Sequence, residues 1–180
     1  LYEYFENEAT VWERQSYLRG RSLGAFNLTA LLQDIVKKGL SEADCQELRE
    51  IRKKLITSEI SNDELNLKHC PGGLVEIEFA VQNAMLKNQL TPKSPNTTET
   101  IQQLMGHNVQ WQKFGLRLIE LYFSFRKMEQ LFQLLASRSV SQVPFTESLF
   151  SNTARFLGVE LESLRKQLIL DLHETREILK

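Results

Sequence analysis

Residues 68–82 read KHCPGGLVEIEFAVQ, a Pro-Gly-Gly turn that leads directly into a helical pattern. The apolar residues of this helix recur at spacings of three and four, in one arc of Leu74, Ile77, Val81 and Met85 and a second of Val75, Phe79 and Leu86. Glu78 and Gln82 fall between the two arcs, whereas Glu76 lies on the more polar side, where solvent or a neighbouring domain could reach it. Because a carboxylate flanked by apolar surface loses hydration, Glu78 requires a cation or hydrogen-bond donors from elsewhere in the chain.

The twin glycines, Gly72 and Gly73, suggest an anion-binding site at the start of this helix. Glycine permits positive φ and close backbone approach, the first amides of a helix have no partner within it, and Lys68 lies just upstream. Two interpretations stay open at this point. The glycine pair is either part of an anion site or only a turn, and Glu78 is either functional or one half of a structural ion pair.

A second cluster of charge lies near the start of the chain, where residues 12–15 read WERQ and residues 18–21 read LRGR. Arg14, Arg19 and Arg21 can reach one side of the first expected helix and the loop after it. There they could pair with Glu78 or hold phosphate oxygens bidentately. The alternative is a set of surface arginines beside a core tryptophan, Trp12.

Composition excludes several classes of protein. The chain has 180 residues, of which 42% are hydrophobic and 25% charged, so it can bury a core, and its net charge of -1 gives no overall attraction to nucleic acid or to an anionic membrane. No apolar run approaches membrane-spanning length, and we expect no leader sequence. Cys45 and Cys70 form neither a disulfide framework nor a spaced zinc pattern, which favours a reduced, cytoplasmic protein without a metal site. Because the chain begins inside an amphipathic segment, we expect it to be a piece of a longer protein.

The helical period recurs along nearly the whole chain, which predicts an all-α bundle of about six to eight helices. Helices are expected over residues 2–19, 28–38, 41–55, 74–90, 99–105, 109–136, 147–157 and 161–179. The expected caps are Asn27 and Thr146, a capping box of Ser41 with Asp44, and C-terminal stops at Gly39 and Gly158. The chain is expected to be one helical domain, 1–180, with sub-lobes 1–90 and 96–180 on either side of a proline-containing loop.

The longest expected helix, 109–136, carries an apolar seam for packing against neighbouring helices. The seam consists of Leu118, Leu121, Phe125, Met128, Phe132 and Leu135. Beside it runs a polar row of Tyr122, Arg126, Glu129 and Gln133, in which Arg126 and Glu129 are spaced to pair. This row either steers a contact with another surface or is a solvated face.

These segments resemble a known family, the bifunctional glutamine synthetase adenylyltransferase and adenylyl-removing enzymes, which are related to the PII uridylyltransferases. The likeness covers almost the whole chain. The family's motif Asp-x-Lys-x-Gly-x-Gly-Gly-x-Arg-Glu-Ile-Glu-Phe-x-x-Gln is matched here by Asn66, Lys68, Gly72, Gly73, Glu76, Ile77, Glu78, Phe79 and Gln82. The family's Trp-Glu-Arg stretch is matched by Trp12, Glu13 and Arg14, followed by Leu18, Arg19 and Arg21, and its later row by Tyr122, Phe125, Arg126 and Glu129.

The departures from the family pattern are as informative as the matches. Asn66 stands where Asp is usual, Cys70 where a small residue is usual, Gly20 where Ala is usual, and Val75 where Arg is frequent. This mixture leaves open whether the chain corresponds to the adenylylating or the adenylyl-removing half. The family's Gly-Ser and Asp-x-Asp motifs, which hold magnesium, have no counterpart in the chain.

The resemblance implies that the parent protein transfers AMP from ATP to a tyrosine of glutamine synthetase, or removes it by phosphorolysis, in nitrogen regulation. Magnesium and ATP would be its cofactors, and glutamine synthetase and the PII signal protein its partners. The fragment itself would contain no catalytic residue and bind neither cofactor alone. The residues expected near phosphate or substrate are Arg14, Arg19, Arg21, Lys68, Gly72 and Gly73, supported by Trp12, Glu13, Glu76, Glu78, Gln82, Arg126 and Glu129.

Two further functions stay open. The chain could be a non-catalytic regulatory or scaffolding module that binds glutamine synthetase or PII through its long helix. It could also come from a degenerate relative that has lost catalysis, which the departures at Asn66 and Cys70 suggest.

Overall fold

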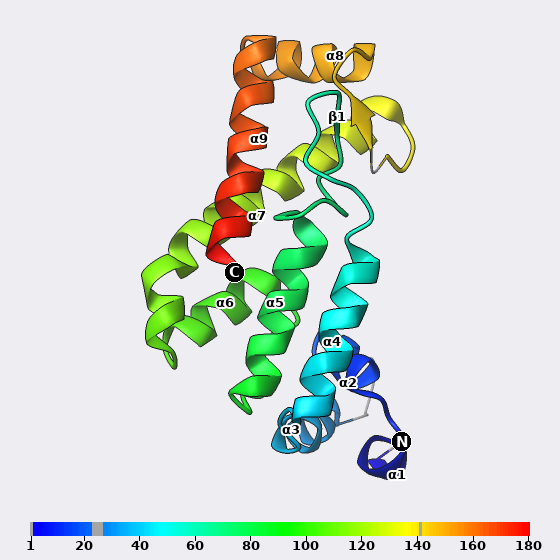
Figure 1. The fold of residues 1–180 in the computed structure, drawn as a ribbon, viewed down its shortest axis with the longest axis vertical. Coiled ribbons are helices and arrows are strands. Elements are labelled where there is room, and N and C mark those ends of the chain that lie inside the picture. Colours follow the sequence, from blue (N-terminus) through cyan, green and yellow to red (C-terminus); the bar gives the residue numbers. More distant parts are fainter. Residues whose placement is uncertain (1, 23–26, 141) are drawn as a thin grey trace. The chain divides into compact units, whose positions relative to one another are not determined.

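The computed structural model describes residues 2–22, 27–140 and 142–180, and within these ranges the chain is mostly helical (Figure 1). The helices are α1 (Tyr2–Asn7), α2 (Val11–Tyr17), α3 (Leu28–Lys37), α4 (Glu42–Leu55), α5 (Leu74–Lys87), α6 (Thr97–Met105), α7 (Val109–Ala136), α8 (Ser148–Leu157) and α9 (Leu161–Ile178). Two strands, β1 (Glu64–Leu65) and β2 (Val143–Pro144), complete the described structure. The prediction of an all-α fold is confirmed.

The chain divides into two compact units. Unit 1 comprises residues 1–54 and 78–116, and unit 2 comprises residues 55–77 and 117–180. This division differs from the expected sub-lobes 1–90 and 96–180, because each unit takes residues from both sides of the loop 90–96. The boundaries at 77 and 116 lie inside α5 and α7, so each of these helices contributes residues to both units.

Two helices of unit 1, α3 and α4, begin and end where local sequence signals predict. The Asn27 side chain accepts a hydrogen bond from the Ala30 amide (3.2 Å), and Gly39 adopts a φ of 60° just after α3. Before α4, the Asp44 carboxylate accepts from the Ser41 amide (2.9 Å) and the Ser41 hydroxyl accepts from the Asp44 amide (3.1 Å). The capping box predicted from these two residues is therefore confirmed.

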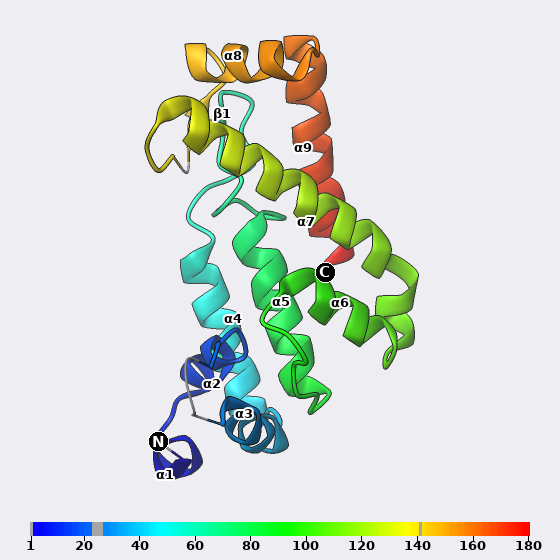
Figure 2. The same ribbon diagram turned by 180° about the vertical axis from the view of Figure 1, so that it is seen from behind.

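The first expected helix, 2–19, is interrupted. Residues 8–10 separate α1 from α2, because Thr10 is extended and caps α2 in a capping box with Glu13. Trp12 is not the core tryptophan considered in the sequence: it is 48% exposed, whereas Phe5 of α1 is buried. Both views in Figure 1 and Figure 2 show α1 lying beside α3.

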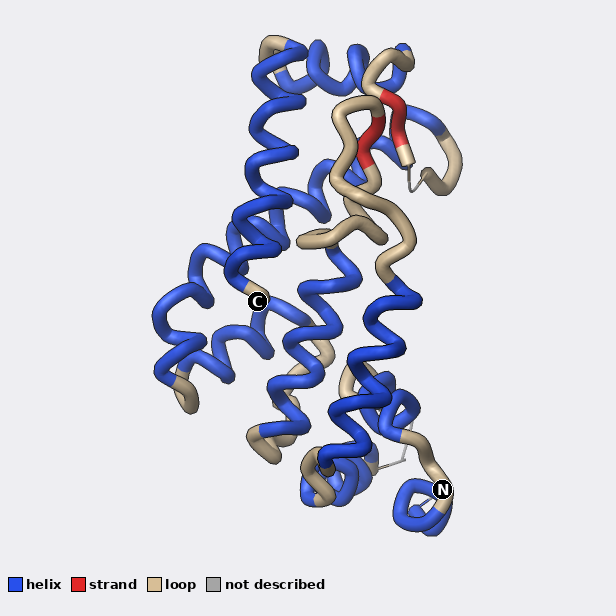
Figure 3. The backbone as a smooth tube through the Cα atoms, in the orientation of Figure 1, coloured by secondary structure: helices blue, strands red, loops and turns tan. Residues whose placement is uncertain are grey.

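Unit 2 contains the two strands, which no sequence pattern predicted. They pair antiparallel, with Glu64 opposite Pro144 and Leu65 opposite Val143, and Figure 3 shows them as short red segments within loops. Strands of two residues are too short for apolar alternation to appear in the sequence.

The remaining helices of unit 2 follow the prediction closely, with one exception. α8 ends at Gly158, which adopts the predicted left-handed conformation with a φ of 67°. The prediction that Thr146 caps α8 is wrong. Glu147 occupies the N-cap position and makes no side-chain capping bond. Among residues 2–22, 27–140 and 142–180, no helix is both long and apolar enough to cross a membrane.

Candidate functional site

The turn before α5 is built around Asn66. Its buried side-chain oxygen accepts hydrogen bonds from the amides of Lys68 (3.2 Å) and His69 (2.9 Å). The Asn66 carbonyl also accepts from the Cys70 amide (3.3 Å). Sequence reasoning missed this role. Asp would supply the same acceptor oxygen, so the departure from Asp to Asn leaves this turn intact.

The twin glycines are required by close packing within unit 2. Gly72 has a φ of 79°, and a Cβ at this position would lie 2.1 Å from the Leu172 carbonyl oxygen of α9. A Cβ at Gly73 would lie 2.7 Å from the Leu67 carbonyl oxygen. Both distances are far below van der Waals contact. Only glycine at position 72 allows the α9 backbone to pack this closely, and only glycine at position 73 allows the turn to fold back on Leu67.

Glu76 was expected on a side that solvent or a neighbouring domain could reach, but it is only 1% exposed. Its carboxylate accepts a hydrogen bond from the Gly72 amide at 2.5 Å. A carboxylate in the first turn of a helix is stabilised by the positive end of the helix dipole. The Glu76 carboxylate therefore occupies the start of α5, where the sequence suggested an anion-binding site, and it accepts the hydrogen bond of the Gly72 amide.

Glu78 confirms the expectation that a buried carboxylate on α5 recruits an arginine from the start of the chain. Its side chain is 12% exposed and forms an ion pair with the guanidinium of Arg19. Arg19, Glu78 and Gln82 line a depression of only about 10 Å³. This is about the size needed for one water molecule, so the depression does not accommodate a nucleotide.

Arg14 is a structural residue in unit 1. Its buried guanidinium donates to the carbonyl oxygens of Gly39 and Ile35 (3.4 Å to the latter) and lies 3.6 Å from the Asp44 carboxylate. Burial lowers the pKa of Arg14, while the neighbouring carboxylate opposes that shift. Because the guanidinium satisfies carbonyls at the end of α3, it joins α2 to the α3–α4 connection.

Two neighbours of Arg14 also hold α2 in place. Glu13 accepts from the Thr10 amide (2.9 Å), and hydrogen bonds first from the Tyr4 hydroxyl and then from Thr10 lower the pKa of its carboxyl. Gln15, which sequence reasoning did not single out, is buried and donates from Nε2 to the Phe79 carbonyl (3.2 Å). No sequence spacing could reveal a contact between residues 64 positions apart.

The polar row on α7 contains the predicted pair. Arg126 donates to Glu129 at 2.7 Å, and its Nε donates to the Tyr122 hydroxyl at 3.1 Å. The guanidinium also lies 5.4 Å from the centre of the Tyr122 ring. Sequence spacing of three and four was sufficient to predict this local cluster.

Three of the four expected phosphate-contacting cations, Arg19, Arg21 and Lys68, are exposed. Arg21 belongs to unit 1, where it lines a pocket of about 240 Å³, and Lys68 belongs to unit 2, at the twin-glycine turn. Unit 1 therefore brings together Arg19, Glu78 and Gln82, whereas unit 2 holds Lys68 near the glycines.

Clustered side chains form no metal site in the part of the chain that the structure describes. No group of three or more His, Cys, Asp or Glu side chains lies there in a position to hold a metal ion. His69 instead places Nδ1 3.2 Å from the Leu55 carbonyl oxygen.

Comparison with known proteins identifies relatives of this chain. A family model described as GlnD PII-uridylyltransferase matches residues 41–180. Bifunctional glutamine synthetase adenylyltransferase/adenylyl-removing enzymes from Xanthobacter autotrophicus and Rhodopseudomonas palustris are 25% and 28% identical over 87% and 88% of the chain. The enzyme of the same name from Shewanella loihica is 36% identical over 47% of the chain, which covers 10% of its own length. The chain spans 17% of the length of the first two relatives.

Proposed function

Because the chain belongs to the GlnD PII-uridylyltransferase family and is a distant homologue of glutamine synthetase adenylyltransferases, we propose that it is the helical part of such an enzyme. The parent protein would transfer AMP from ATP to a tyrosine of glutamine synthetase, or remove that AMP by phosphorolysis, in the cytoplasm. The observation that carries this proposal is the alignment with these enzymes over 87% and 88% of the chain.

The chain's own contribution would be positioning and charge. Arg14, Glu13 and Gln15 hold α2 in place, and the Arg19–Glu78 pair joins α2 to α5. Two exposed cations, Arg21 in unit 1 and Lys68 in unit 2, would each stabilise negative charge on phosphates. The chain alone would not catalyse transfer, because the family's Gly-Ser and Asp-x-Asp motifs have no counterpart in its sequence.

Transfer of labelled AMP to glutamine synthetase tests the proposal. A polypeptide that contains this chain together with a nucleotidyltransferase core should incorporate label from ATP, or release it in the presence of phosphate, whereas the 180-residue chain alone should do neither. If the longer polypeptide neither adds nor removes AMP, the proposal is wrong.

A second measurement concerns Lys68. Lys68→Gln should lower turnover of the longer polypeptide roughly tenfold, corresponding to one lost charge-assisted contact, with unchanged helicity by circular dichroism. Lys166→Gln, a substitution of another exposed lysine in unit 2, is the matched control and should leave turnover unchanged. Equal turnover in both variants would remove Lys68 from the proposed machinery.

An alternative function, a non-catalytic module that binds glutamine synthetase or PII, is favoured by the outer face of α7. Phe123 and Leu134 are both exposed there, and their spacing of eleven residues places them on the same side of the helix. A pull-down with each purified partner, comparing the chain with its Phe123→Ser variant, separates the two functions. Retained AMP transfer by the longer polypeptide together with lost capture would assign α7 to partner binding rather than catalysis.

A further inference from the structure

Unit 1 contains a pocket of about 240 Å³ whose charged wall comes from two separate segments of the chain. Arg21, just after α2, and Lys93, in the loop between α5 and α6, both line it. The hydroxyl-bearing residues Thr29 and Ser94 line it as well, and no Asp or Glu is present among the described residues of its wall. Two cations without a carboxylate around one cavity favour an anionic ligand.

The loop that carries Lys93 is held in a defined conformation. The Gln103 side chain of α6 accepts from the Lys93 amide (3.1 Å) and donates to the Thr91 carbonyl (2.9 Å). The Thr100 hydroxyl donates to the Asn96 carbonyl (2.9 Å) and also lies 3.3 Å from the Ser94 carbonyl oxygen. These bonds hold the loop backbone on both sides of Lys93. Ligand binding therefore loses little free energy to ordering this loop.

The segment that carries Arg21 follows directly after α2. Gln15 and Arg19 anchor that helix to Phe79 and Glu78 of α5. A Cβ at Gly20 would lie 3.0 Å from the Tyr17 carbonyl oxygen, so the chain leaves α2 in close contact with its own last turn. Arg21 therefore follows directly after an anchored helix end.

The start of α3 adds a third source of positive potential. Leu28 and Thr29, the first two residues of this ten-residue helix, line the same pocket. The first amides of a helix carry a partial positive charge, which supports anion binding when side-chain cations are also present.

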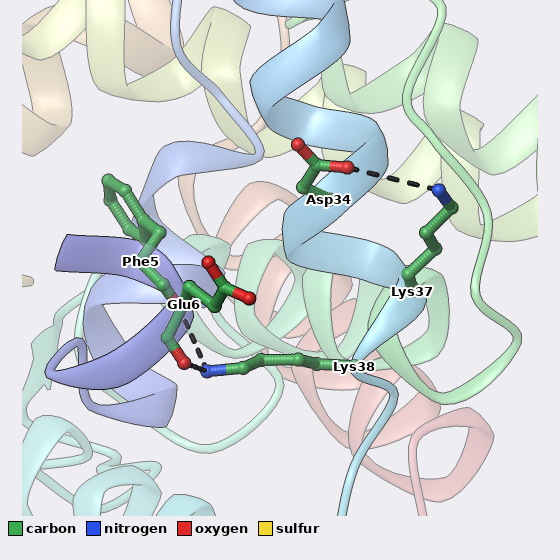
Figure 4. A pocket seen from close by; sticks show the side chains of 5 residues that line it. All are labelled: Phe5, Glu6, Asp34, Lys37 and Lys38. Atoms are coloured by element: carbon green, nitrogen blue, oxygen red, sulfur yellow. Dashed lines mark hydrogen bonds and ion pairs between the residues drawn. The ribbon is translucent and has the colours of Figure 1, made fainter. Parts of the chain in front are cut away.

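A second cavity in unit 1 shows a different arrangement. It measures about 430 Å³, and its two lysines already have partners: Lys37 lies 3.9 Å from the Asp34 carboxylate, and Lys38 donates to the carbonyls of Phe5 (3.0 Å) and Glu6 (Figure 4). Both acidic side chains lie in its wall. This cavity therefore provides a control in the same unit.

We infer that the pocket between Arg21 and Lys93 binds a small ligand through a phosphoryl group, with the two cations on its oxygens and Thr29 and Ser94 within its wall. For Arg21 this deepens the phosphate role given under the proposed function, and it adds Lys93 and a defined cavity. The apolar part of the wall, which includes Leu28 and Pro95, is suited to the carbon skeleton that carries the phosphoryl group.

Calorimetric titration of the 180-residue chain with inorganic phosphate, pyrophosphate and AMP, each separately, tests the inference. At least one of the three should bind, and Arg21→Gln and Lys93→Gln should each weaken that binding about tenfold or more. Lys37→Gln, in the control cavity, should leave the affinity unchanged. All three substituted residues are exposed, so the variants should keep the thermal stability of the parent chain.

The relative affinities identify the part of the ligand that is recognised. Tighter binding of AMP than of phosphate would assign the sugar or base to the apolar wall, and equal affinity would assign the phosphoryl group alone. The inference is wrong if none of the three binds at about 10 mM, or if Lys37→Gln weakens binding as much as the two pocket variants. Because this titration requires no AMP transfer, its failure is distinguishable from failure of the proposed function.

Discussion

At the scale of single residues, Gly72 illustrates how one position joins the turn before α5 to α9. Its positive φ and its closeness to the Leu172 carbonyl oxygen both exclude a side chain, whereas Gly158 has a similar φ of 67° but no neighbouring atom within 4 Å. Gly158 is therefore needed only for its positive φ, whereas Gly72 is needed both for its positive φ and for close packing against α9.

We predict that Gly72→Ala destabilises the chain much more than Gly158→Ala. Each substitution costs about 1 kcal/mol for an alanine at positive φ. Gly72→Ala should cost about 2 kcal/mol more, because its Cβ overlaps a backbone oxygen that cannot move without displacing α9. Urea unfolding followed by circular dichroism measures both. Equal losses in the two variants would contradict the packing role.

Cys70 makes a second prediction at this scale, on pH dependence. Burial raises the pKa of the Cys70 thiol from 9.0 to about 12. The unfolded thiol loses its proton first as pH rises, so the native state binds more protons above pH 9. Stability is fully present below that pH and falls above it, by at most about 1.4 kcal/mol per pH unit.

The measurement is urea unfolding at pH 8 and pH 10 for the parent chain and two variants. Cys70→Ala should remove this part of the alkaline loss of stability, whereas Cys45→Ala, which replaces a half-buried cysteine, should retain it. If Cys70→Ala loses as much stability between the two pH values as the parent chain, the pKa of the Cys70 thiol is not raised by burial.

At the scale of elements, α7 has two faces of opposite character. Phe125 is fully buried, but Phe123, two residues earlier, is 68% exposed. The predicted seam of Leu118, Leu121, Phe125, Met128 and Phe132 is buried, while Leu135 at its end is 38% exposed. A helix of this length contacts neighbours along one side only, so burial follows the helical period rather than residue type.

Alanine substitutions on these two faces should differ sharply. Phe125→Ala should cost about 3–5 kcal/mol, because it leaves a cavity in the core, whereas Phe123→Ala should change stability by less than about 0.5 kcal/mol. Thermal or urea unfolding of both variants provides the comparison. A large loss for Phe123→Ala would mean that this side of the helix is covered in solution.

At the scale of the whole molecule, the two units interleave along the chain. Unit 1 requires residues 78–116 to complete a fold that begins at the N-terminus, and unit 2 requires residues 55–77 to complete one formed mainly by residues 117–180. Loop 90–96 was expected to divide the chain because of its prolines, but Pro92 is buried and the loop is held by Gln103.

This arrangement predicts that residues 1–90 and 96–180 do not fold when produced separately. The first fragment lacks α6, whose Ile101 and Leu104 are fully buried, and the second lacks the twin-glycine turn on which α9 packs. Neither should show a cooperative unfolding transition. Cooperative unfolding of either fragment alone would restore the division at residues 90–96.

Much of the secondary structure could be predicted because its signals are local. Asn27, Gly39 and the Ser41–Asp44 box mark helix ends through atoms only a few residues apart, and the bounds of α7 follow from an uninterrupted period. The break before Thr10 was missed because a capping box competes with a continuous apolar pattern that also suits one longer helix.

The helical class, most helix ends and the need of the Glu78 carboxylate for a cation could all be predicted, since each depends on the spacing of neighbouring residues. Packing between distant segments instead determines that Arg19 supplies that cation, that Arg14 is buried at the end of α3, and that the Glu76 carboxylate binds the Gly72 amide at the start of α5. Such packing also brings Lys93 to the same pocket as Arg21. These contacts depend on how helices pack across long stretches of chain, which local spacing does not encode.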